Sequence, residues 1–443
     1  MIKSKGFIFC LFLIFLPAGV HAWTEDIFAH FQPYIFLEEE YNSNIDLTPN
    51  RFKKSDYITT ISPGFRISMS RRAQVPGEFR GTPTAEERFG LDLDLRAGFV
   101  FYGREEDNNY ISLNGTLNAW YAFSRNLTFH VRDYLIRSDE IRESDFSVTA
   151  PEGQTFFART RVREPYYRNV FEPSLEYRFG RENVLALNYR NTLYEINSRT
   201  AENSVENSIN PRLTYWLNVR HGMFLEYNLT FGNLQRSPDW VGNMILGRYI
   251  YRFNPRTSVF GEYTQSWRNF DSPSVDYVIY RPSLGVEHAF SPTLSSSARI
   301  GYFWQNPKRG STISGFSYDA SLSKREAKTT YTLSFQGGYT EEFFTAENLG
   351  FVKTHRVIGR VSHQLMQRMS IGLYGSYERA KYPTPIGGEK PVDRISVAGA
   401  TATYQALRWL NLSLDLSHRE NRANISERRY SEYRGFLRIT ATY

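Results

Sequence analysis

The chain has almost no cysteine. The single one, Cys10, lies in an apolar run from Phe7 to Leu16, without the small residues that precede a lipoprotein cysteine. A disulfide or a thiolate metal site therefore cannot form within this chain. We expect packing and hydrogen bonds to hold the fold, and we expect no lipid anchor.

Long apolar runs are missing beyond the first residues. There, two lysines precede the run from Phe7 to Leu16, and the small residue Ala22 comes just before Trp23. This pattern predicts a signal peptide over residues 1–22 and a secreted domain over residues 23–443. No later stretch of roughly 18 apolar residues is present, so a helical membrane span is not expected.

Lysine is scarce, and linkers rich in Pro or Ser are absent. Ten of the 53 basic residues are lysines, which leaves 43 arginines, and removal of the signal peptide lowers the formal net charge from +7 to +5. The planar guanidinium of arginine engages carboxylates through two hydrogen bonds. The excess of arginine over lysine suits a crowded interior with paired charges. The missing linkers favour one large domain.

Alternation of apolar and polar residues is abundant instead. Leucines occupy positions 410, 412, 414 and 416, while Asn411, Ser413, Asp415 and Ser417 lie between them. Such a period of two indicates strands with one apolar face. Aromatic residues form 16% of the chain, as expected where two aromatic girdles surround a membrane-spanning barrel.

Short turn signals alternate with longer polar segments. We expect the short turns to be periplasmic: Ser124–Asn126, Gly180–Asn183, Arg220–Gly222, Asn254–Arg256, Ser291–Thr293, Lys324–Glu326, Gln367–Arg368 and Leu407–Arg408. The longer segments should face outward: Ser138–Glu164, Asn197–Asn207, Gln305–Thr312, Glu341–Gly350 and Tyr382–Pro391. The sequence thus predicts an all-β, antiparallel up-and-down transmembrane barrel of about 18–20 strands. An even number places both termini in the periplasm.

The last strand ends in an aromatic residue. Gly435, Leu437, Ile439, Ala441 and Tyr443 share one face. This ending resembles the terminal signal read by the barrel-assembly machinery, which we expect as a partner together with outer-membrane lipid. We expect no nucleic acid partner.

Two segments near the start of the secreted domain resemble a known family. They are Glu39-Glu40-Tyr41-Asn42-Ser43-Asn44-Ile45 and Ser55-Asp56-Tyr57-Ile58-Thr59-Thr60-Ile61-Ser62-Pro63-Gly64. They resemble the opening of an outer-membrane β-barrel porin family that includes members associated with the PEP-CTERM exopolysaccharide system. The resemblance implies a large Gram-negative outer-membrane barrel with a transport role, polysaccharide-export proteins as partners, and no catalytic residues to carry over.

The polar faces of the strands supply candidate lumen-lining residues. These are Asp92, Asp94, Arg96, Arg190, Glu226, Glu262, Arg268, Arg299, Asp415 and Arg438. Arginines along a confined path attract anionic solutes and oppose cations. Alternatively, these charges pair across neighbouring strands and stiffen the wall.

Other features have two interpretations each. The segment Ser138–Glu164 can be a loop that folds into the lumen or an ordinary outer loop. Asp46 and Asp56, near Asn42 and Asn44, offer oxygen ligands for calcium, but turn formation explains the same residues. We expect no metal and no cofactor.

Enzyme chemistry has little support. The sequence contains no Gly-x-Ser-x-Gly or His-Glu-x-x-His motif, and of the scattered histidines His355 and His418 are the candidates for partners at the outer rim. We therefore expect a channel for anionic or saccharide solutes, with a link to exopolysaccharide secretion, and no catalytic residues. The alternatives are a structural or adhesive barrel plugged by its own loops and, third, a barrel enzyme.

Overall fold

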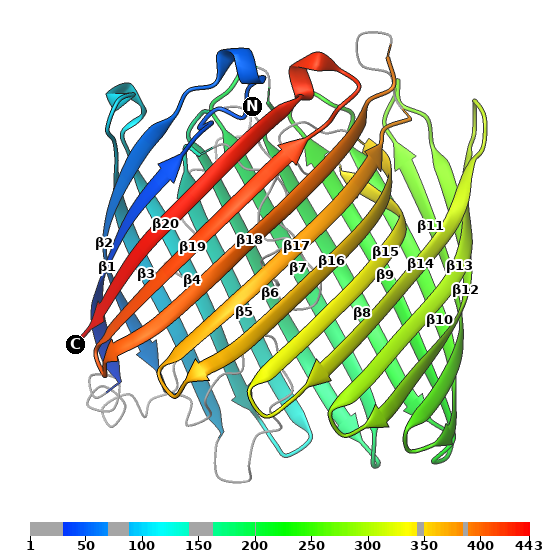
Figure 1. Cartoon of the computed structure of the whole chain (residues 1–443). Helices are drawn as coiled ribbons and strands as arrows, with labels where there is room; N and C mark the ends of the chain where they lie inside the picture. Colours follow the sequence, from blue (N-terminus) through cyan, green and yellow to red (C-terminus); the bar gives the residue numbers. More distant parts are fainter. Residues whose placement is uncertain (1–29, 70–87, 141–162, 200, 343–349, 384–388) are drawn as a thin grey trace, which may run out of the picture.

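The protein forms a barrel of antiparallel strands in the computed structural model (Figure 1). The structure describes residues 30–69, 88–140, 163–199, 201–342, 350–383 and 389–443. The strands are β1 (Phe31–Asn42), β2 (Asp56–Ser68), β3 (Phe89–Tyr102), β4 (Tyr110–Ala122), β5 (Leu127–Ser138), β6 (Tyr166–Phe179), β7 (Asn183–Ile196), β8 (Ser204–Trp216), β9 (His221–Leu234), β10 (Trp240–Asn254), β11 (Thr257–Phe270), β12 (Tyr277–Ser291), β13 (Leu294–Pro307), β14 (Ile313–Arg325), β15 (Thr329–Glu342), β16 (Gly350–Met366), β17 (Met369–Lys381), β18 (Val392–Leu407), β19 (Leu410–Asn421) and β20 (Tyr430–Thr442). Within these residues, three short 3-10 helices lie in connections: η3 (Asn50–Phe52), η4 (Glu106–Asn108) and η6 (Ser426–Arg428).

The sheet closes on itself. Each strand pairs with its neighbours in sequence, and β1 also pairs with β20, from Tyr34 opposite Thr442 to Asn42 opposite Arg434. Closure leaves no edge strand with unpaired backbone groups. The prediction of an all-β antiparallel barrel is confirmed, with 20 strands at the upper value of the predicted range.

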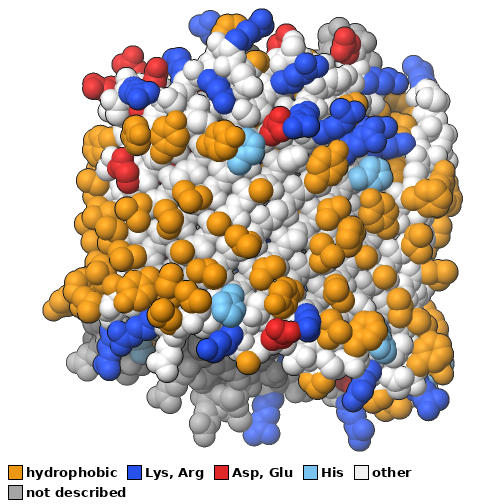
Figure 2. All heavy atoms as spheres, viewed as in Figure 1, with side chains coloured by type: hydrophobic (Ala, Val, Ile, Leu, Met, Phe, Trp, Pro, Cys, Tyr) orange, Lys and Arg blue, Asp and Glu red, His pale blue; other side chains and the backbone are white. Residues whose placement is uncertain are grey.

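The alternation in the sequence separates an outer from an inner face. Leu284 and Ile300 are register partners and are 69% and 62% exposed, while Ser283 on the opposite face is 6% exposed. Figure 2 shows many such apolar side chains over the outer surface. Burying one of them in an apolar medium is favourable by about 1.5–3 kcal/mol, so the outer face suits lipid. Among the described residues, no helix is long and apolar enough to span a membrane.

The connections fall into two groups at opposite ends of the barrel. The short-turn end holds compact connections such as the one between Ser291 and Leu294, as predicted. The end of β2 at Ser68 and the start of β3 at Phe89 also lie at this end. Tyr443 also lies there, where its backbone N–H donates to the Pro33 carbonyl at 2.9 Å.

The long-loop end holds the longer connections. The predicted loop Tyr382–Pro391 matches the gap between β17 and β18. The predicted loop Asn197–Asn207 is too long, because β8 already begins at Ser204. The predicted loop Gln305–Thr312 begins too early, because β13 continues to Pro307. Asn207 pairs with Asn191 and with Phe231, so the sheet includes polar residues for which the sequence predicts a loop. Most of Ser138–Glu164 and the whole predicted signal peptide lie outside the described residues.

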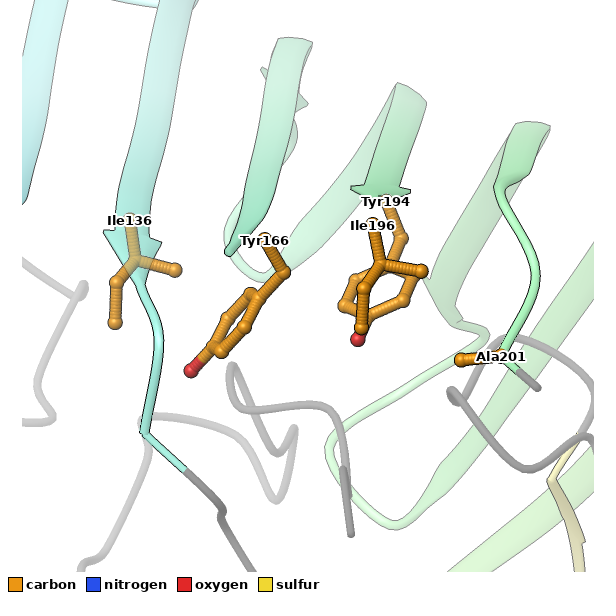
Figure 3. Packing of buried hydrophobic residues seen from close by; sticks show 5 residues of the cluster. All are labelled: Ile136, Tyr166, Tyr194, Ile196 and Ala201. Carbon is orange, nitrogen blue, oxygen red and sulfur yellow. The ribbon is translucent and has the colours of Figure 1, made fainter. Parts of the chain in front are cut away.

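The inner face is apolar near the long-loop end. Ile136, Tyr166, Tyr194 and Ile196 from β5, β6 and β7 pack with Ala201 of the next loop (Figure 3). A second such cluster contains Ile58, Val100 and Tyr102 with Ile45 of the β1–β2 loop. The inner face is therefore not uniformly polar, because loop residues cover part of it.

Candidate functional site: charged clusters on the inner face

The largest charged cluster surrounds Glu262 of β11. The Glu262 carboxylate accepts hydrogen bonds from Arg248 of β10, Nη2 to Oε2 at 2.5 Å, and from Arg299 of β13, Nη1 to Oε1 at 3.0 Å. Arg281 of β12 lies 3.8 Å from Oε1. One carboxylate therefore faces three guanidinium groups, which we call the Glu262 cluster.

Strand register brings these four residues together. Arg248 is directly opposite Glu262, while Arg281 is opposite Thr264, two residues further along β11. Arg299 is opposite Gly285, where the Phe260 ring occupies the place that a side chain would take. All four side chains lie on the face opposite to the exposed leucines, which is the inner face of the wall.

Exposure differs sharply between the carboxylate and the arginines. The Glu262 side chain is 0% exposed, whereas those of Arg248, Arg281 and Arg299 are 28%, 23% and 31% exposed. The negative charge is covered, and the positive charges form the accessible surface. The more accessible part of the cluster is therefore positively charged.

A smaller cluster on β5, β6 and β7 repeats this arrangement. Glu172 of β6 lies 3.0 Å from Nη2 of Arg132 and 3.5 Å from Nε of Arg190. The Glu172 side chain is 10% exposed, against 25% and 23% for the two arginines. We call it the Glu172 cluster, and again the guanidinium groups are the more accessible part.

Two further predicted residues are paired elsewhere on the wall. Arg268 donates to Oε2 of Glu341 at 2.6 Å and lies over the Trp240 ring, 5.2 Å from its centroid. Arg438 of β20 forms an ion pair with Glu38 of β1. Glu38 and Arg438 are on neighbouring strands, as the structural alternative for such charges predicts, whereas Glu341 belongs to β15, which is not adjacent to β11.

The remaining predicted residues have polar or aromatic neighbours. Asp94 accepts hydrogen bonds from the Tyr34 hydroxyl at 2.5 Å and from Arg66 at 2.7 Å, and Asp92 accepts one from Ser68 at 2.5 Å. The Arg96 guanidinium lies over the Phe36 ring at 4.7 Å. Glu226 is opposite Arg212 in register, and Asp415 accepts a hydrogen bond from the Tyr374 hydroxyl at 3.2 Å.

The structure brings together only a few of the ten predicted residues. Glu262 and Arg299 share a cluster, whereas the others are spread around the wall. The sequence interpretation missed Arg248, Arg281, Arg132 and Glu172. Their alternation with apolar neighbours was a usable signal for the inner face, but their pairing depends on register between strands.

Asp56 and Asn44, two of the residues considered for calcium, form hydrogen bonds with the backbone. Asp56 is fully buried and accepts hydrogen bonds from the backbone N–H groups of Tyr57, Arg104 and Glu105. Asn44, also fully buried, binds the backbone of Thr48 through both ends of its amide. Within the described residues, no group of three or more His, Cys, Asp or Glu side chains could hold a metal ion.

Loops at the long-loop end are held by further charged contacts. Arg163 donates to Oδ1 of Asp46 at 3.0 Å, to the Tyr102 hydroxyl at 2.7 Å and to the Ile45 carbonyl at 2.6 Å. At another loop, a hydrogen bond from the Lys308 amine lowers the pKa of Asp276. These contacts fix loop ends at the rim of the barrel.

The two histidines considered for catalysis contact tyrosines. His355 Nδ1 lies 3.0 Å from the Tyr318 hydroxyl. The His418 ring stacks on Tyr433 with centroids 4.2 Å apart, and its Nδ1 lies 3.1 Å from the Glu432 carbonyl. These contacts describe aromatic packing on the outer face rather than a nucleophile with its base.

Comparison with solved structures finds other barrels at low identity. OccAB4 of Acinetobacter baumannii has 12% identity and a TM-score of 0.47, and the match covers 94% of this chain and 98% of that one. The siderophore receptor PirA of Pseudomonas aeruginosa has 9% identity and a TM-score of 0.49, with 94% and 80% covered. OpdK of Pseudomonas aeruginosa, solved with vanillate, has 9% identity and a TM-score of 0.44, with 94% and 99% covered.

Sequence comparison identifies the family. A search of curated proteins found no match. The family described as "Putative beta-barrel porin 2" matches residues 172–443, from within β6 to the last residue of the chain. The matched region contains the whole Glu262 cluster and the strand that closes the barrel. The chain therefore belongs to this family of porin-like outer-membrane β-barrels.

Proposed function

We propose that the protein is an outer-membrane channel that favours anionic solutes, including acidic saccharides, over cations. The observation that carries this proposal is the covered Glu262 carboxylate among three partly exposed guanidinium groups. The Glu172 cluster supports it independently, because there too the arginines are more exposed than the carboxylate. Fixed positive charge along a confined path raises the local concentration of anions.

The proposal includes an orientation and a biological setting. The long-loop end would face outward, and both termini would be periplasmic in a Gram-negative cell. The terminal strand, with Tyr443 fully exposed at its end, would be recognised by the barrel-assembly machinery. Deletion of Tyr443 should then lower the amount of barrel recovered from the membrane. Exopolysaccharide secretion is the transport role that the arginine surplus suits.

The test is the reversal potential of the refolded secreted domain in a planar bilayer under a salt gradient. We expect anion-selective openings. Arg281→Gln and Arg299→Gln should each lower the anion-to-cation permeability ratio by roughly two- to fivefold, since an accessible charge contributes up to about 1 kcal/mol. Alginate in one chamber should reduce the current more than neutral dextran of similar size.

Arg256→Gln is the matched control, because Arg256 lies in the exposed turn between β10 and β11. Its permeability ratio should equal that of the unmodified protein. Cation selectivity, or equal effects of Arg281→Gln and Arg256→Gln, would contradict the proposed role of the Glu262 cluster.

A barrel closed by its own loops is the second candidate, and the contacts of Arg163 favour it. Arg163 joins the end of the β5–β6 connection to Asp46, Tyr102 and Ile45. If the loops plug the barrel, the bilayer stays silent although the protein is folded. Arg163→Ala should then produce openings, because it removes these hydrogen bonds.

A further inference from the structure

A group of basic side chains lies on the outer face of β17 and β18. Arg379 of β17 and Arg394 of β18 are direct register partners, and Lys381 follows Arg379 on the same face. Figure 2 shows Lys and Arg side chains gathered high on this side of the barrel. We call Arg379, Lys381 and Arg394 the basic patch.

The outer face of β17 changes character along its length. Ile371 and Leu373 are exposed and apolar, Tyr377 is exposed and aromatic, and Arg379 and Lys381 follow toward the long-loop end. Aromatic side chains typically lie at the level of the lipid headgroups, where one end is apolar and the other wet. The basic patch is therefore at or just beyond the headgroup level.

The basic patch has no carboxylate of its own in the described part of the chain. Glu378 and Asp393, next to the patch in sequence, lie on the opposite face and pair with Arg356 and Arg428. Among the described residues, no ion pair joins Arg379, Lys381 or Arg394 to an acidic side chain. The Nε atom of Arg379 is buried without a hydrogen-bond partner. Like charges directly opposite each other destabilise a sheet, so an anion from outside the chain would relieve this repulsion.

We propose that the basic patch binds the phosphate of a lipid headgroup in the leaflet at the long-loop end. A phosphate offers several acceptor oxygens, and two guanidinium groups side by side can each donate two hydrogen bonds to them. Lys381 adds a third positive charge. The apolar residues below the patch would contact the acyl chains of the same lipid. This proposal does not depend on solute selectivity.

The experiment measures lipid binding to the full secreted domain in detergent by native mass spectrometry. The probe is lipid A with two phosphates, titrated against the same lipid without phosphates. We expect the phosphorylated probe to bind more tightly. Arg379→Gln with Arg394→Gln should weaken it by about 10- to 30-fold, since each basic residue near a lipid surface contributes about 1 kcal/mol.

Two further variants keep the result interpretable. Arg220→Gln with Arg256→Gln removes two exposed arginines from the short-turn end and should leave binding unchanged. Arg379→Lys with Arg394→Lys keeps the charge and should restore part of the affinity. The heat-dependent gel mobility of each variant reports whether the barrel is folded. If Arg379→Gln with Arg394→Gln does not fold, Arg394→Gln alone replaces it.

Three results would overturn the proposal. Equal binding of the lipid without phosphates would remove the role of phosphate. An equal loss of lipid binding in Arg379→Gln with Arg394→Gln and in Arg220→Gln with Arg256→Gln would remove the role of the basic patch. Inorganic phosphate that binds as tightly as the phosphorylated lipid would show that the patch takes a free anion and not a headgroup.

Discussion

Glu262 is the carboxylate shared by three arginines on the inner wall. Its carboxylate is fully covered and neutralises part of the charge of Arg248, Arg281 and Arg299. A covered carboxylate that loses its charge leaves the arginines without compensation, whereas loss of one arginine leaves two others in place. The two kinds of substitution should therefore have opposite effects on selectivity.

Glu262→Gln should raise the anion-to-cation permeability ratio and lower the free energy of unfolding by about 3–5 kcal/mol, as for a broken buried ion pair. The reversal potential measures the first effect and urea unfolding in detergent measures the second. Glu287→Gln is the control, because Glu287 is exposed and accepts one hydrogen bond from Ser258, at 3.3 Å. A lower permeability ratio in Glu262→Gln would contradict the role assigned to the carboxylate.

At the scale of elements, the seam between β1 and β20 closes the barrel. Glu38 pairs with Arg438, and Glu40 lies 2.8 Å from Arg434. Asn42 adds a hydrogen bond to Glu432 at 2.9 Å. These residues are nearly 400 positions apart in sequence, so the contacts form only when the sheet closes.

Glu38→Gln with Glu40→Gln should weaken closure. We expect each substitution to lower the free energy of unfolding by about 1–3 kcal/mol, because Arg438 loses its carboxylate and Arg434 keeps only the more distant Glu140 and Glu432. The folded barrel should therefore convert to the slow-migrating unfolded form at a lower temperature in gel electrophoresis.

Glu39→Gln is a control on the same strand. Glu39 points to the opposite face and accepts a hydrogen bond from Thr59 at 2.7 Å. Its replacement should leave the conversion temperature nearly unchanged. If Glu39→Gln and the double variant behave alike, the seam does not depend on these ion pairs.

At the scale of the whole molecule, the strands enclose one interior, and the proposed function requires the charges on its wall to act together. The Debye length is about 10 Å at 0.1 M salt and about 3 Å at 1 M. Charges separated by more than that distance are screened from a passing solute. Selectivity that comes from clusters on several strands should therefore depend on ionic strength.

We expect anion selectivity to be clear in 0.1 M salt and to fall toward unity in 1 M salt. Reversal potentials at a fixed gradient and rising mean concentration measure this dependence. Selectivity that stays constant over the same range would indicate one narrow binding site rather than a field from the wall.

The sequence by itself determined the class of the fold. Alternation such as that from Leu410 to Ser417 requires a strand with two unlike faces, and the turn Ser291–Thr293 required a chain reversal, because these signals act between residues close in sequence. They predicted the strands, most turns and the inner face. They overextended two loops, because Val205 to Asn207 and Gln305 to Pro307 contain polar residues that pair across the sheet.

Only the tertiary structure decided which residues meet. Arg248, Glu262, Arg281 and Arg299 come from four strands, and their distances depend on the register of each pair. A shift by one residue would turn a side chain to the other face, and no single strand specifies that register. The same holds for the burial of Glu262, for the apolar clusters near the long-loop end and for the basic patch. Each depends on neighbouring strands that only the closed barrel brings together.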